Sequence, residues 1–158
     1  MKKRIALAIA PVAALLLATG CSTQTASPSG TSDSEVGRAA LVIAQGGLGD
    51  ESYNDLALSG FNEGLESTGV EGTAIESDDV VGQGEQILRR AGDSGLGLVI
   101  DLEYSHAEIL PQVAADYPDT DWVMVNAVAA GDNVASVLFQ EQEGSYLAGA
   151  LAAIQTTN

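Results

Sequence analysis

Short apolar runs alternate with segments of helical periodicity along most of the chain, and glycine, aspartate, serine or proline marks each change. The first apolar run, residues 38–45, contains Ala-Ala-Leu-Val-Ile-Ala without a polar break. A run of this kind suits a parallel strand that is buried on both faces. From Tyr53 onwards, apolar or small residues recur every three or four positions, as on one face of a helix. This alternation predicts a β/α fold.

The same pattern continues to the end of the chain and predicts an α/β fold with a doubly wound parallel sheet. Helices are expected from residue 53, after the turn at residues 77–79, over residues 105–117 and over residues 144–156. The inward face of the second helix should carry Val81, Gly84, Ile87, Leu88 and Ala91. The expected strands are residues 38–45, 71–76, 96–100, 122–125 and 134–139.

Polar residues follow each of the first four expected strands. These segments are residues 46–54, 77–79 and 101–104, together with Asn126. In an open parallel sheet, ligands usually bind beyond the carboxyl ends of the strands, which meet at one edge. We therefore expect these four loops to line one edge of the sheet and to contain any binding site.

The N-terminus has the features of a targeting segment. Three basic residues at positions 2–4 precede an apolar run, residues 5–18, that is too short for a stable membrane span. The stretch Leu-Ala-Thr-Gly-Cys at residues 17–21 resembles the bacterial lipobox, in which the cysteine is acylated after cleavage before it. We expect a signal peptide at residues 1–20 and a lipid anchor on Cys21, on the extracytoplasmic side of the cell membrane. The alternative is an ordinary signal peptide with an incidental cysteine.

Residues 22–35 contain no large apolar side chain and are rich in serine and threonine, which predicts a flexible tether over residues 21–36. The chain has six basic and 22 acidic residues, a formal charge of −16. Removal of residues 1–20 would leave three basic and 22 acidic residues, a formal −19. Such a chain has nothing to neutralise phosphates, so nucleic-acid binding is excluded and the membrane contact must come from the acyl chains.

The strand-end loops suggest two kinds of cofactor site, but the residues present fit neither of them. The glycines at residues 46–49 suggest a phosphate loop, but Ser52 stands where the third glycine of the dinucleotide fingerprint belongs, and Asp50 would repel phosphate. A magnesium or phosphoacceptor site would use acidic residues without any lysine nearby, and helix capping explains these residues better. These acids are Asp50, Asp78, Asp79, Asp101 and Glu103. No cofactor or metal is expected.

The chain shows no pairing of a nucleophile with a base, so we do not expect an enzyme. His106 is the single histidine, and we expect it to be partly exposed in the first turn of the third helix. Ser145 lacks the Gly-x-Ser-x-Gly spacing of a nucleophile elbow. Trp122 begins a strand and is expected to pack in the core.

Two motifs carry a family resemblance. Residues 49–54 read Gly-Asp-Glu-Ser-Tyr-Asn, and residues 133–149 run from Asn-Val-Ala-Ser to Glu-Gly-Ser-Tyr-Leu-Ala-Gly. They resemble the basic membrane lipoprotein family, the Med/PnrA-like substrate-binding lipoproteins of ABC importers. The resemblance covers about residues 39–155 and includes the lipobox. It implies one lobe of a type I periplasmic-binding-protein-like fold.

Members of that family bind nucleosides between two lobes and deliver them to a membrane permease, which implies a nucleoside-like ligand and an ABC permease as partners. The resemblance places ligand-binding residues at the strand ends. A carboxylate there can accept hydrogen bonds from ribose hydroxyls, and an aromatic ring can stack on a purine. Tyr53 replaces the usual phenylalanine, and packing in the core is an alternative role for it; Asn126 stands where an aspartate is expected. The expected ligand-binding residues are Asp50, Ser52, Tyr53, Asn54 and Asn126.

The resemblance also implies about twice this length, so residues 37–158 are expected to be the N-terminal lobe of a truncated receptor whose second lobe is missing. A different class of function is a surface-anchored interaction protein or degenerate receptor lobe without a transport role. Such a protein would self-associate or bind a partner through the apolar face that the missing half exposes. The very apolar segment at residues 144–154 motivates this alternative.

Overall fold

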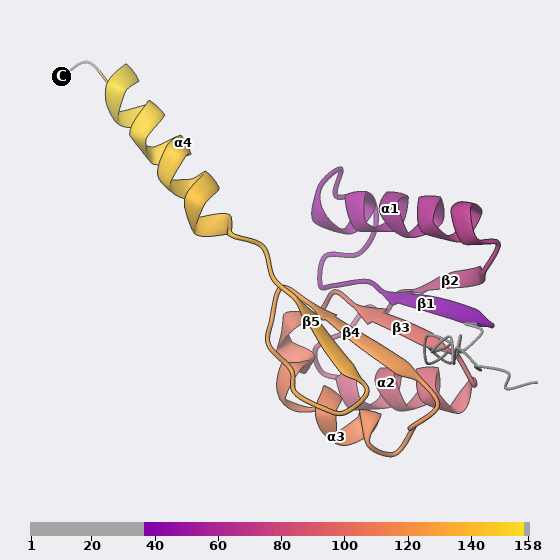
Figure 1. Ribbon diagram of the computed structural model, residues 1–158. Coiled ribbons are helices and arrows are strands. Elements are labelled where there is room, and N and C mark those ends of the chain that lie inside the picture. Colours follow the sequence, from indigo (N-terminus) through magenta and orange to yellow (C-terminus); the bar gives the residue numbers. More distant parts are fainter. Residues whose placement is uncertain (1–36, 157–158) are drawn as a thin grey trace, which may run out of the picture. The chain divides into compact units, whose positions relative to one another are not determined.

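The computed structural model describes residues 37–156, which contain a parallel β-sheet with helices on both of its faces (Figure 1). The expected α/β class is therefore confirmed. The expected signal peptide, tether and lipid-modified Cys21 lie outside the described residues. The elements in chain order are β1 (Arg38–Val42), α1 (Tyr53–Thr68), β2 (Glu71–Ile75), α2 (Gly84–Asp93), β3 (Leu98–Asp101), the 3-10 helix η1 (Tyr104–Glu108), α3 (Leu110–Ala114), β4 (Asp121–Val125), β5 (Val134–Val137) and α4 (Glu141–Gln155).

The five strands are parallel and have the order β2-β1-β3-β4-β5. This is a doubly wound order, with β1 between β2 and β3. The chain leaves β1 towards β2 on one side and reaches β3 on the other, so the strand order reverses at β1. A crevice therefore opens between the loops that follow β1 and β3, and ligands of doubly wound sheets bind at such a point.

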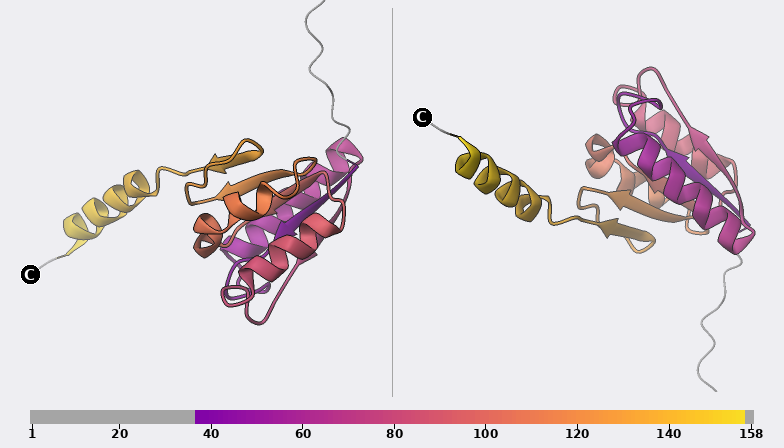
Figure 2. Two further views of the ribbon diagram at one scale, coloured as in Figure 1. Left: turned by 90° about the horizontal axis from the view of Figure 1, so that it is seen from below. Right: turned by 90° about the horizontal axis from the view of Figure 1, so that it is seen from above.

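Successive side chains of β1 enter two different cores, as the period of two in a strand requires. Leu41 packs on the face that α1 covers, together with Phe61 from that helix. Val42 packs on the opposite face with residues of α2 and α3 and with Trp122, which is buried as expected. Figures 1 and 2 show α1 on one face of the sheet and α2 and α3 on the other.

The expected boundaries agree with the structure to within a few residues for most elements. Gly69 follows α1 with φ 72°, a left-handed conformation that glycine adopts without a steric penalty. The segment 105–117, however, is not one helix but η1 followed by the short α3. Pro111 lies in the first turn of α3, where its missing N–H costs nothing. A continuous helix would place this proline in the interior and break it.

The inward face expected for the second helix is correct in four of its five positions. Gly84, Ile87, Leu88 and Ala91 are buried. Val81 is 47% exposed, and the neighbouring Val80 is buried in its place. The reason is that α2 begins only at Gly84, so residues 78–83 form turns that do not keep the helical phase.

Helix α4 differs from the other helices in its burial. None of its residues is buried, and its large apolar side chains are exposed. These are Tyr146, Leu147, Leu151 and Ile154. Among residues 37–156, no helix combines the length and the hydropathy needed to cross a membrane.

Candidate ligand-binding site

A small pocket of about 240 Å³ lies at the carboxyl edge of the sheet. The loops after β1, β3 and β4 contribute to it, together with the first residue of α1, so three of the four expected loops meet there. The loop after β2 does not line it. The lining residues are Ala44, Gln45, Tyr53, Leu102, Glu103, Tyr104 and Asn126.

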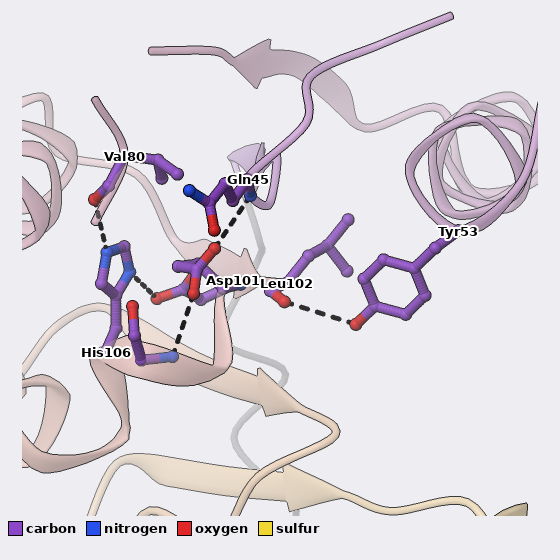
Figure 3. A network of polar contacts seen from close by, with 8 residues as sticks. Gln45, Tyr53, Val80, Asp101, Leu102 and His106 are labelled. Carbon is purple, nitrogen blue, oxygen red and sulfur yellow. Dashed lines mark hydrogen bonds and ion pairs between the residues drawn. The ribbon is translucent and has the colours of Figure 1, made fainter. Parts of the chain in front are cut away.

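Tyr53 presents an aromatic ring at the rim of this pocket. Its hydroxyl donates a hydrogen bond of 3.3 Å to the carbonyl of Leu102, and 37% of the residue is exposed (Figure 3). Burial raises the pKa of Tyr53, and the negative charges of Asp101, Glu141 and Glu103 raise it further. The ring is therefore held in a fixed position as a neutral phenol. A tethered ring with one accessible part can stack on a flat ligand.

Glu103 closes the floor of the pocket and is 1% exposed. One carboxylate oxygen accepts a hydrogen bond of 2.8 Å from the backbone of Gln45, and the other accepts one of 3.1 Å from that of Ser105. Burial by itself would raise the pKa of Glu103, but these hydrogen bonds lower it below its ordinary value. The ionised side chain thus joins the loop after β3 to the loop after β1.

Asn126 directly follows β4 and has a left-handed conformation, with φ 68°. Asparagine tolerates this region better than most residues do. Its side-chain amide donates a hydrogen bond of 2.9 Å to Glu141 at the start of α4. The carbonyl oxygen of the same side chain has no such partner among the described residues, so it is available to a hydroxyl or an amine of a ligand.

Two of the five residues expected to bind ligand line the pocket, namely Tyr53 and Asn126. Asp50, Ser52 and Asn54 do not line it. The carboxylate of Asp50 accepts hydrogen bonds from the backbone of Ser52, Asn54 and Asp55, at 2.9, 3.0 and 3.2 Å. These bonds, led by the one from Asn54, lower the pKa of Asp50. Asp50 therefore caps α1, and Ser52, the N-cap residue, makes no side-chain capping bond.

The pocket also contains residues that the sequence motifs did not single out as ligand contacts. Gln45 and Glu103 line it, and Tyr104 exposes 67% of its surface there. The segment 101–104 follows an apolar strand, and this position at a strand end was the sequence signal that could have indicated a role in the pocket. Side-chain identity alone did not indicate that Glu103 would point inwards.

His106 is buried, contrary to the expectation of partial exposure. It is 1% exposed, and its ring lies between Asp101 and the carbonyl of Val80. The expectation was wrong because the ring pairs with Asp101 at the end of β3 and with the loop after β2, and α2 packs against it at Gly84. Within residues 37–156, no group of three or more histidine, cysteine, aspartate or glutamate side chains is arranged to hold a metal ion.

A family model described as ABC transporter substrate-binding protein PnrA-like matches residues 38–158. The chain belongs to this family. The PnrA-like assignment agrees with the resemblance of the two sequence motifs and with the doubly wound sheet. It places the chain among the substrate-binding proteins of ABC transporters.

Curated relatives and solved structures agree with the PnrA-like assignment. The chain is 30% identical to the ABC transporter nucleoside-binding protein BmpA of Lactococcus lactis, over 99% of this chain and 46% of that protein. It is 26% identical to basic membrane protein A1 of Borrelia garinii, over 78% of this chain and 37% of that protein. The chain thus spans less than half the length of these curated relatives.

Among solved structures, an ABC transporter solute-binding protein from Aeropyrum pernix matches with a TM-score of 0.63 and 35% identity. The match covers 73% of this chain and 32% of that one. A lipoprotein fragment from Peptoclostridium difficile matches with a TM-score of 0.58 over 75% of this chain and 98% of that one. At 21% identity, this second match supports the fold alone.

Proposed function

We propose that this chain forms one wall of a nucleoside-binding cleft in the receptor of an ABC importer. The observation that carries the proposal is the strand-end pocket, in which the ring of Tyr53 and the free amide oxygen of Asn126 line the same space. A ring that stacks on a base and an amide that bonds a hydroxyl are the groups that a neutral nucleoside requires. The nucleoside-binding relative of Lactococcus lactis supports this ligand class.

Tyr104 is a second stacking group in this proposal. It lines the same pocket as Tyr53 and is largely exposed, so a base can reach its ring without displacing packed side chains. The ionised Glu103 gives the pocket a negative character, and the chain as a whole is strongly acidic. A neutral nucleoside is therefore favoured over a nucleotide, whose phosphates would be repelled.

The proposal includes a lipid anchor at Cys21 and delivery of the ligand to a membrane permease. The lipobox-like sequence at residues 17–21 and the lipoproteins among the relatives support the anchor. Metabolic labelling with radioactive palmitate in bacterial cells tests it. We expect label on the full chain and none on the Cys21→Ser variant, and equal labelling of both would refute acylation at this cysteine.

Ligand binding is tested by titrating the full chain with adenosine, uridine and, as a control of a different class, glucose, followed by NMR. A single wall leaves half of the ligand in water, so we expect weak binding. The dissociation constant should lie in the millimolar range, which corresponds to a binding free energy of about −4 kcal/mol. The shifted signals should include Tyr53, Tyr104 and Asn126. Glucose producing the same shifts, or nucleosides producing none, would contradict the proposal.

A second candidate is an interaction role, and a specific apolar surface favours it. A groove of about 480 Å³ runs between α1 and the sheet, and it is lined almost entirely by apolar residues, including Leu41, Phe61, Ile100 and Phe139. Helix α4 carries a separate set of exposed apolar side chains. Patches of this kind mark interaction sites. Light scattering at rising protein concentration tests it, since a strictly monomeric mass would count against self-association.

A further inference from the structure

Both ring nitrogens of the buried His106 face hydrogen-bond acceptors. Nδ1 lies 2.8 Å from a carboxylate oxygen of Asp101, and Nε2 lies 2.9 Å from the carbonyl oxygen of Val80 (Figure 3). His106 is 1% exposed and Asp101 is 0% exposed. Solvent therefore does not compete for either contact.

These two contacts require a proton beyond those of a neutral imidazole. A neutral ring carries one N–H and can satisfy one acceptor, whereas an ionised Asp101 and the carbonyl of Val80 both need a donor. Although burial lowers the pKa of His106, the hydrogen bond to Asp101 and the charge of that carboxylate outweigh it and raise the pKa above its ordinary value. Burial raises the pKa of Asp101. The pair therefore holds its extra proton more firmly than either isolated side chain would.

The protonated pair connects three loops of the sheet edge. Val80 belongs to the loop after β2, and Asp101 ends β3. The second carboxylate oxygen of Asp101 accepts a hydrogen bond of 3.0 Å from the backbone of Glu103. Glu103 in turn accepts from the backbone of Gln45, in the loop after β1. A continuous chain of hydrogen bonds thus runs from the β2 loop, which lies outside the candidate pocket, to residues that line it.

Packing fixes the ring from the other side. A Cβ at Gly84, the first residue of α2, would lie 2.5 Å from two ring atoms of His106, so α2 can start there only with a glycine. The charged groups that act on the ring are Asp101 from β3 and Glu103 from the loop that follows it. On the remaining sides α2 presents Gly84, and the β2 loop presents the Val80 carbonyl.

We propose that His106 is a positioning residue for ligand binding, which holds the loops after β1, β2 and β3 in place by donating from both ring nitrogens. The inference rests on the proposed nucleoside function of the pocket. His106 does not line that pocket and acts through Asp101 and Glu103. Loss of the ring proton leaves two acceptors with one donor and loosens the loops. Ligand affinity then falls as the pH rises, although a neutral ligand such as adenosine does not titrate in that range.

The first test is an NMR titration of the full chain with labelled histidine, whose ring signals come from His106 alone. We expect both ring nitrogens to carry a proton at pH 6 and the ring to titrate above pH 6.5. The backbone amides of Gln45 and Ser105 should shift with the same midpoint, since both donate to Glu103. A ring that titrates at or below 6.5, or amides that do not follow it, would overturn the positioning role without reference to any ligand.

The second test measures adenosine affinity at pH 6 and pH 9 for the native chain and for His106→Asn and His106→Gln, each of which keeps one amide donor. We expect the native chain to bind adenosine about tenfold more weakly at pH 9 than at pH 6, a loss of about 1.4 kcal/mol. Both variants should bind weakly at either pH. Equal affinity of the native chain at the two pH values overturns the positioning role and leaves the proposed function intact. No binding at any pH overturns the proposed function, and the NMR titration then decides the role of His106.

Discussion

The side-chain amide of Asn54, in the first turn of α1, bonds both backbone groups of Ala44 in the loop after β1. Its oxygen accepts from the Ala44 N–H at 3.0 Å, and its nitrogen donates to the Ala44 carbonyl at 3.3 Å and to the Gly47 carbonyl at 2.9 Å. Asn54 is 2% exposed. The residue that the family motif suggested as a ligand contact is thus a loop anchor, which closes the glycine turn over the start of the helix.

Replacement of this anchor should destabilise the fold. In Asn54→Ala, the backbone N–H of Ala44 and the carbonyl of Gly47 lose their partners in a partly buried place. We expect a loss of about 1 to 3 kcal/mol in the free energy of unfolding, measured by urea denaturation. Ser52→Ala is the matched control, because the Ser52 side chain makes no capping bond. Its stability should stay within about 0.5 kcal/mol of the native value. Equal effects of the two changes would refute the anchoring role.

The carboxylate of Asp50 should stabilise the start of α1 at neutral pH. Its pKa is lowered by the backbone N–H groups that it caps, first of all that of Asn54. A lowered folded-state pKa gives stability that is present above the unfolded value of 3.8 and is lost as the pH falls through the folded value. We expect Asp50→Ala to lower the melting temperature at pH 7 and to lose this difference in strong acid. Melting curves from pH 2 to pH 7 measure it, and a constant difference would contradict the cap.

The His106 and Asp101 pair predicts a loss of stability on the alkaline side. The folded-state pKa of His106 lies above 6.5, so its contribution is complete below pH 6.5 and is lost as the pH rises through the folded value. Urea denaturation between pH 6 and pH 9 should show this decrease in the native chain and not in His106→Gln. Removal of one partner of a buried pair costs about 3 to 5 kcal/mol, so the variant is expected to be less stable throughout. A native chain with constant stability over this range would contradict the assignment.

The two tyrosines of the pocket should differ in what they contribute. Tyr104 is exposed, so Tyr104→Ala should change stability by no more than about 0.5 kcal/mol. If its ring stacks on a base, adenosine binding should weaken by about 1 to 3 kcal/mol. Tyr53→Phe keeps the ring and removes only the 3.3 Å hydrogen bond to Leu102, so its effect on binding should be smaller. NMR titrations of both variants measure these affinities, and unchanged binding in Tyr104→Ala would exclude stacking there.

The order of the elements and the edge on which the site lies could be predicted from the sequence. Apolar runs and helical periodicity are local properties of the chain, and parallel strands place all their carboxyl ends at one edge. The turn at Gly69 was likewise predictable from a single residue. The helix expected over residues 105–117 is divided in the structure into η1 and α3, because Pro111 cannot lie in the interior of a continuous helix.

Within the site, the residue types indicated which side chains could form hydrogen bonds, and only the folded arrangement showed which partners they have. Asp50 and Asn54 lie in the family motif, yet their polar atoms are used by backbone groups of the same loop. Tyr53 and Asn126 lie far apart in the sequence and meet at the pocket because β1 and β4 end at the same edge.

The sequence by itself determined the fold class and the family of this protein, because periodicity and motifs depend on neighbouring residues. The tertiary structure decided which polar groups are paired within the molecule and which line the pocket. Burial of His106 depends on Asp101 and on the carbonyl of Val80, 26 residues away in the chain, and on the space left by Gly84. Burial and the pairing of polar groups are properties of the packed molecule, and the hydrogen bond and charge of Asp101 raise the pKa of this histidine at the pocket edge.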